Sequence, residues 1–124
     1  SEAAQRLLNE AARYLGTPYV WGGYSPSGFD CSGFVSYCLT HSGVRNTGRL
    51  TAQGLYDICT PVSQSEAQPG DLIFFTGTYD AGVPVTHIGI YVGNGQMIHC
   101  GHPVQYTSIN SPYWQSHFYG FGRW

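Results

Sequence analysis

Three residues of this sequence have side chains suited to nucleophilic catalysis. Cys31 follows Asp30, a residue type that favours the N-cap, and opens a predicted amphipathic helix. His87 and His99 lie downstream in two segments rich in apolar residues. The unpaired amides and the positive dipole at a helix start favour thiolate over thiol. Because a thiolate with a histidine base in reach can attack a carbonyl carbon, the pattern predicts a cysteine nucleophile.

The register of one hairpin decides whether the two histidines can act together. The predicted strands 85–92 and 96–100 flank Gly93-Asn94-Gly95. A two-residue Asn94-Gly95 loop would put the histidines on opposite faces, because side chains alternate along a strand. A three-residue loop closed by a bulged glycine puts both on one face and makes the other face apolar. We therefore expect the three-residue loop, with Cys100 in the core.

This register assigns a role to each residue. Cys31 attacks the carbonyl carbon, and its backbone amide donates to the oxyanion. His87 takes the thiol proton and later gives a proton to the leaving amine. His99 accepts from the other ring nitrogen of His87 and sets its tautomer.

The elements that must position these residues are helices followed by strands. Apolar side chains at helical spacing predict three helices, and the later apolar segments predict five strands. The helices are expected at 3–15, 31–41 and 52–58, and the strands at 72–76, 85–92, 96–100, 104–108 and 118–123. Residues 112–114 are expected to form a loop. The pattern predicts one α+β domain over 1–124, with N-terminal helices packed on an antiparallel sheet.

Composition narrows the choice of partners. Of the 124 residues, 10% are charged and 15% aromatic, with a net charge of −2, which supplies no basic stripe for nucleic acid. The aromatic content fits either a packed β-rich core or a groove for an uncharged polymer or peptide. No apolar run reaches the length of a membrane span. The chain begins at Ser1 without an initiator Met or signal peptide, so we expect a domain excised from a longer exported protein.

The cysteines suggest no metal centre. No Cys-x-x-Cys pair, the usual mark of structural zinc sites, is present among Cys31, Cys38, Cys59 and Cys100. If Cys31 stays reduced, at most one disulfide can form. We expect mostly buried, reduced cysteines, with one disulfide as the alternative, and neither a metal nor another cofactor.

Several ordered motifs point to one family. The motifs are Tyr14-Leu15-Gly16-Thr17-Pro18-Tyr19-Val20-Trp21-Gly22-Gly23, Asp30-Cys31-Ser32-Gly33-Phe34-Val35, Pro69-Gly70-Asp71-Leu72-Ile73-Phe74-Phe75, His87-Ile88-Gly89-Ile90-Tyr91-Val92-Gly93 and Met97-Ile98-His99. Together they resemble the NlpC-type family of bacterial cell-wall cysteine peptidases, which adopt a compact papain-like fold. The C-terminal segment 113–124 looks like the peptidase domains of two-domain wall hydrolases from mobile elements.

The resemblance implies an activity and a set of site residues. The activity is metal-independent hydrolysis of the bond between the γ-carboxyl of D-glutamate and a diamino acid in peptidoglycan stem peptides. The catalytic residues are Cys31, His87 and His99, with Tyr19 beside the oxyanion. The substrate side of the cleft is expected at Asp30, Ser32, Trp21 and Arg49. For Asp30 a purely N-capping role, and for Arg49 a solvated side chain, remain alternatives.

The family setting also implies a location and partners. The protein is expected outside the cell or on the wall of a bacterium, as a monomer, with a glycan-cleaving domain in the same full-length chain. Two other readings stay open. One is an N-acetylmuramoyl amidase or a transpeptidase on the same scaffold, and the other is a catalytically dead wall-binding module.

Overall fold

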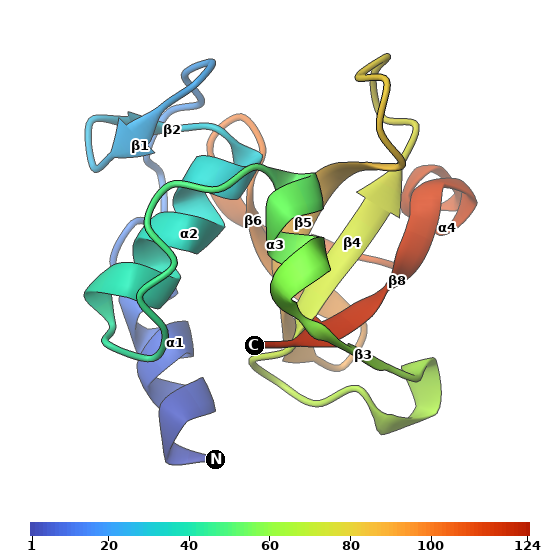
Figure 1. The fold of residues 1–124 in the computed structure, drawn as a ribbon, viewed down its shortest axis with the longest axis horizontal. Coiled ribbons are helices and arrows are strands. Elements are labelled where there is room, and N and C mark those ends of the chain that lie inside the picture. Colours follow the sequence, from blue (N-terminus) through green and yellow to red (C-terminus); the bar gives the residue numbers. More distant parts are fainter.

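A six-stranded antiparallel sheet lies at the centre of the computed structural model, which describes residues 1–124 (Figure 1). The strands follow the order β3-β8-β4-β5-β6-β7 across the sheet. Their bounds are β3 Thr60–Val62, β4 Leu72–Thr76, β5 Val85–Gly93, β6 Gln96–Cys100, β7 Val104–Ser108 and β8 Phe118–Arg123. A separate two-stranded sheet consists of β1 (Tyr24–Ser25) and β2 (Gly28–Phe29).

Helices cover this sheet from two sides. The four α-helices are α1 Glu2–Ala12, α2 Cys31–His41, α3 Ala52–Ile58 and α4 Pro112–His117, and a 3-10 helix covers Gln64–Glu66. Figure 1 shows α1 and α2 together at the left and α4 beside β8 at the right. No helix is both long and apolar enough to cross a membrane. The predicted α+β class, with helices packed on an antiparallel sheet, is confirmed.

The helix that carries Cys31 begins where predicted but is more deeply buried than predicted. Asp30 is its N-cap, and the Asp30 carboxylate accepts the backbone N–H of Gly33 at 2.7 Å. Eight of its 11 residues are buried, so the expected amphipathic helix with one apolar face is wrong. The helix lies between the sheet on one side and α1 and residues 17–29 on the other. Gly33 permits this, because a Cβ there would lie 1.9 Å from the Gly23 carbonyl oxygen.

The first helix is shorter than the predicted 3–15. Ser1 caps α1, which ends at Ala12. Residues 13–16 form a turn, and the N–H of Gly16 donates to the Val104 carbonyl instead of continuing the helix. Leu15, which the prediction placed in this helix, lies beyond its end and is 44% exposed.

The hairpin brings the two histidines to one face, although its turn differs from the prediction. The turn is the two-residue Asn94-Gly95 loop with Gly93 paired to Gln96, and both loop residues have positive φ, as a type I′ turn requires. A register shift between Tyr91 and Gly93 then acts as a bulge, with Gly93 at φ +90°. Beyond it Ile90 pairs with Ile98, the register of the predicted three-residue loop.

Alternation along the strands gives the sheet two apolar faces. Leu72 and Phe74 of β4 join the large cluster under α1, α2 and α3, whereas Ile73 and Phe75 join a smaller one on the opposite face. Cys100 lies in the large cluster, as predicted, and its thiol donates to the Phe29 carbonyl at 3.2 Å.

The later strands match the sequence expectations closely, and one helix was missed. The strands expected at 72–76, 96–100, 104–108 and 118–123 have these bounds in the structure, and the one expected at 85–92 extends by one residue. Residues 112–114, expected as a loop, belong to α4. Ser111 caps this helix by accepting from the Trp114 N–H, and Pro112 occupies its first turn.

Candidate active site

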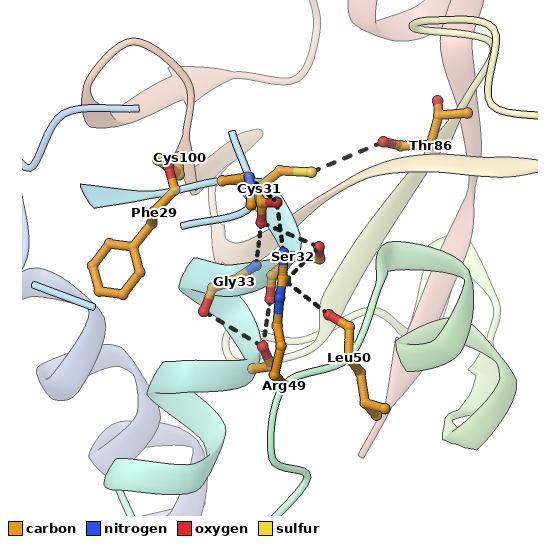
Figure 2. A network of polar contacts seen from close by, with 11 residues as sticks. Phe29, Cys31, Ser32, Gly33, Arg49, Leu50, Thr86 and Cys100 are labelled. Atoms are coloured by element: carbon orange, nitrogen blue, oxygen red, sulfur yellow. Dashed lines mark hydrogen bonds and ion pairs between the residues drawn. The ribbon is translucent and has the colours of Figure 1, made fainter. Parts of the chain in front are cut away.

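Cys31 lies at the first position of α2 and faces a cavity of about 590 Å³. Its side chain is 9% exposed. The thiol donates to the backbone carbonyl of Thr86, with 3.9 Å between sulfur and oxygen, and Figure 2 shows the sulfur pointing toward that residue. Thr86 directly precedes His87 on β5. The helix start therefore holds the thiol against the strand that carries His87.

Burial gives the free Cys31 thiol a high pKa. Desolvation, followed by the negative charge of Asp30, raises the pKa of Cys31 to about 11. The backbone amides of Ser32 and Ile88 and the charge of Arg49 lower it only in part. The direction is opposite to the depressed pKa expected at a helix start, because desolvation in this packed site outweighs the helix-end effect. In the substrate-free protein the side chain is a thiol.

The two histidines form a hydrogen-bonded pair. His87 Nε2 and His99 Nδ1 are 2.9 Å apart, and His99 Nε2 is 2.9 Å from the Thr107 hydroxyl oxygen. Burial, with the nearby His99, lowers the pKa of His87 to about 3, and burial lowers the pKa of His99 to about 4. Both rings are therefore neutral near pH 7. A His87 that keeps Nδ1 free as a base carries its proton on Nε2 and donates it to His99.

Two neighbours shape the histidine pair. Gly89 leaves the space between them, because a Cβ there would meet the Met97 sulfur at 2.8 Å and the His99 Cβ at 3.2 Å. Trp114 of α4 stacks on His87 with ring centres 5.1 Å apart and 28° between planes, and presents its edge to His99. The indole thus packs against both rings of the pair.

A second polar cluster beside Cys31 consists of Asp30, Ser32 and Arg49. An Arg49 guanidinium nitrogen lies 2.6 Å from the Asp30 carboxylate, and another donates to the Ser32 hydroxyl at 3.0 Å and to the Leu50 carbonyl at 3.0 Å (Figure 2). The Asp30 carboxylate also accepts from the Gly22 amide at 3.1 Å. The structure therefore differs from two alternatives considered above, a purely N-capping Asp30 and a solvated Arg49 side chain. Asp30 caps the helix and also binds Arg49, and Arg49 is an ion-pair partner rather than a solvated side chain.

The predicted substrate-side residues share one cavity. Its lining includes Tyr19, Trp21, Asp30, Cys31, Ser32 and Arg49. Burial, then the charges of Cys31 and Asp30, raise the pKa of Tyr19 to about 12, which keeps its phenol a hydrogen-bond donor. Trp21 is 76% exposed and packs edge-on against Tyr79 of the β4–β5 loop, with ring centres 5.9 Å apart.

Not all of the predicted catalytic residues contact one another or the cavity. Neither His87 nor His99 lines the cavity, and no hydrogen bond links the Cys31 thiol to His87. Both histidines therefore lie outside the lining of the cavity that Cys31 faces. No group of three or more His, Cys, Asp or Glu side chains lies close enough together to hold a metal ion.

Two residues of this site were not anticipated from the sequence. Thr107 could have been found, because pairing of Met97 with Thr107 and of His99 with Gln105 makes His99 and Thr107 diagonal neighbours. Trp114 could not, because its contact with His87 depends on α4, which the sequence reading treated as a loop. The assembled groups are a buried thiol, an oriented neutral imidazole and a phenol donor, and they are equipped for acyl transfer.

Known proteins are similar to this chain over nearly its whole length. The bifunctional muramidase/DL-endopeptidase CwlT of Bacillus subtilis (strain 168) is 44% identical over 121 residues, which cover 96% of this chain and 36% of CwlT. The probable endopeptidase p60 of Listeria seeligeri is 48% identical over 118 residues, covering 94% of this chain and 21% of p60. The chain thus spans about a third or less of these relatives.

Structural similarity extends over the same region. The crystal structure of a lipoprotein-like NLP/P60 family protein from Staphylococcus aureus Mu50 superposes with a TM-score of 0.92 at 44% identity, over 99% of this chain and 41% of that one. The family model described as NlpC/P60 family matches residues 16–123, a range that contains every candidate residue of the site. By sequence and by fold, the chain belongs to the NlpC/P60 family.

Proposed function

We propose that this domain is a peptidoglycan endopeptidase that hydrolyses the bond between the γ-carboxyl of D-glutamate and the diamino acid of stem peptides. The observation that carries the proposal is the placement of Cys31 at a helix start, at the edge of a cavity and against the strand of a neutral, oriented His87. The names of the relatives, a DL-endopeptidase and probable endopeptidases, support the same reaction class.

Acylation begins with a proton transfer within the catalytic pair. The Cys31 proton moves to Nδ1 of His87 as the sulfur attacks the γ-carbonyl carbon of D-glutamate. Because the free thiol has a high pKa and the free imidazole a low one, this transfer accompanies substrate binding rather than preceding it. For this transfer the thiol gives up its hydrogen bond to the Thr86 carbonyl.

The tetrahedral intermediate needs donors for its oxyanion. The Cys31 amide is the first N–H of α2 and has no partner within the helix. The Tyr19 phenol is the second donor, since its raised pKa keeps the proton in place. Two donors fixed before the reaction stabilise the developing charge without reorganisation.

Collapse of the intermediate and hydrolysis complete the cycle. The carbon–nitrogen bond breaks, and the proton on His87 Nδ1 goes to the departing amine, which leaves a γ-glutamyl thioester on Cys31. Water then loses a proton to His87 as it attacks the thioester carbonyl. The products are a γ-carboxylic acid and the thiol, with that proton returned to sulfur. His99 donates nothing to substrate and holds the His87 tautomer through both steps.

The remaining predicted residues position the substrate. Asp30, through Gly22 and Arg49, ties the Trp21 loop to the start of α2. Ser32 contributes its hydroxyl to the same cluster. Trp21 presents an exposed ring at the rim of the cavity, where a stem peptide can pack against it.

The setting of the domain is also part of the proposal. We propose that residues 1–124 are one peptidase domain that acts outside the cell or at the bacterial wall, as a monomer. The coverage of only 36% of CwlT, a bifunctional muramidase, supports the presence of a glycan-cleaving domain in the full-length chain.

The test is digestion of defined muropeptides followed by mass spectrometry. We expect release of the diamino-acid fragment, loss of this product in Cys31→Ala, and full activity in Cys38→Ala, whose cysteine is buried outside the cavity. Cleavage that survives Cys31→Ala contradicts the mechanism. A lactyl–alanine cut or a new cross-link identifies an amidase or a transpeptidase. Binding without any product identifies a wall-binding module.

A further inference from the structure

The cavity beside Cys31 corresponds to one side of the scissile bond. Thr86 and Val85 line it, but neither histidine does. In the proposed reaction His87 protonates the leaving amine, so the diamino acid leaves on the histidine side. The cavity then holds the acyl side of the substrate, which is D-glutamate and the residues before it. This assignment rests on the proposed function.

Three lining residues have acidic or basic side chains, and two of them form an ion pair with each other. The carboxylate of Asp30 and the guanidinium of Arg49 are 2.6 Å apart. Arg49 also donates to Ser32 and to the Leu50 carbonyl, so three of its five N–H donors are engaged. The only cation of the cavity is therefore neutralised before a substrate arrives.

The third charged residue, Asp57 of α3, has no cationic partner. None of the four ion pairs in the structure includes it. Its carboxylate accepts from the Gln53 side-chain amide at 3.0 Å, and the Gln53 carbonyl oxygen accepts the Val85 N–H at 2.9 Å. Asp57 is exposed, so these hydrogen bonds place its carboxylate on the solvent-facing part of the cavity lining, without a cation beside it. The lining carries a net charge of −1.

This charge bears directly on the chemical form of the substrate. D-Glutamate joined through its γ-carboxyl keeps its α-carbonyl group next to the scissile bond, as either a carboxylate or a carboxamide. A carboxylate entering this cavity meets like charge and loses hydration, whereas a carboxamide has the same shape without the charge. Its NH2 group can also donate to a carboxylate. We propose that the cavity selects stem peptides whose D-glutamate is amidated at the α-carboxyl, that is, D-isoglutamine.

The test compares two stem peptides that differ only in this group. We expect kcat/KM for the amide to exceed that for the acid by roughly three- to tenfold at low ionic strength. The ratio should fall toward one in Asp57→Asn, which keeps the hydrogen bond from Gln53. It should also fall as salt is added, because charge repulsion is screened. Glu66→Gln removes the same charge outside the cavity and should leave the ratio unchanged.

Other results overturn the proposal. Faster cleavage of the acid would mean that Arg49 exchanges Asp30 for the substrate carboxylate. An equal ratio, or one that Asp57→Asn does not change, removes the role of the cavity charge. The affinity of each peptide for Cys31→Ala, measured by calorimetry, tests the selectivity of the cavity independently of cleavage. This measurement distinguishes failure of the selectivity proposal from failure of the proposed function. If neither peptide is cleaved by the parent protein at the γ-glutamyl bond, the proposed function fails whatever the binding preference.

Discussion

The neutral histidine pair should make the stability of the domain fall steeply in mild acid. His87 and His99 bind a proton in the unfolded chain near the ordinary pKa of 6.5, but in the folded protein only near pH 3 to 4. Between these values the unfolded state holds more protons, so falling pH favours unfolding. The free energy of unfolding is therefore not reduced by the pair above about pH 6.5, and it decreases progressively as the pH falls below that value.

The size of the effect follows from these shifts. Between pH 7.5 and pH 5.5 each histidine should lower the free energy of unfolding by about 1.4 kcal/mol, and the pair by about 2.7 kcal/mol. That is a large part of the ~5–15 kcal/mol by which a domain is stable. Carboxylates contribute little over this interval, because their ordinary pKa values lie near 4.

Urea denaturation monitored by tryptophan fluorescence at pH 7.5, 6.5 and 5.5 measures this directly. The parent protein should lose stability with falling pH. A single His99→Asn variant should show about half the slope, and a double variant with His87→Gln should show almost none. A parent protein whose free energy of unfolding is constant over this range, or rises toward acid, would refute the assignment of two neutral rings with lowered pKa values.

Three further predictions concern the nucleophile, the cover of the base and the packing of α2. Alkylation of Cys31 by iodoacetamide in substrate-free protein should keep rising about tenfold per pH unit through pH 9, as a pKa of about 11 requires, and a plateau by pH 8 would contradict this. Trp114→Ala exposes His87 to water, so the acid limb of its kcat/KM profile should shift to higher pH, whereas a merely structural loss would lower activity at every pH. Gly33→Ala should cost about 1–3 kcal/mol of unfolding free energy by overpacking. The control Gly120→Ala, where a Cβ meets nothing within 4 Å, should cost less than half as much in the same urea titration.

The register of the histidine hairpin was predictable from the sequence, although its turn was not. Burial of an apolar face requires Ile90 opposite Ile98, and this demand holds across the body of the strands. The turn type is set by the local sequence, because Asn-Gly favours a turn in which both residues have positive φ. The bulge before Gly93 reconciles the two. A prediction in which the turn alone sets the register therefore puts both histidines on the correct face but gives the wrong loop length.

Other features depend on contacts between distant segments, and no local pattern encodes them. Arg49 pairs with Asp30, which lies 19 positions earlier in the sequence, only because residues 42–50 run back along α2. The high pKa of Cys31 arises from desolvation by the folded chain, whereas a helix start considered alone predicts the reverse. By contrast, β4, β6 and β7 were predicted correctly from short segments of strand-forming residues that are bounded by Gly, Pro and Asn, because turn chemistry acts locally there.

The position of β8 has a consequence for synthesis of the chain. It is the last strand of the sheet in sequence but lies inside it, between β3 and β4. On the ribosome β4 therefore emerges long before its partner, and one of its edges stays unpaired until Arg123 has left the exit tunnel. A prematurely terminated chain would contain Cys31 and both histidines but no closed sheet to hold them. Completion of the sheet around these three residues therefore requires β8.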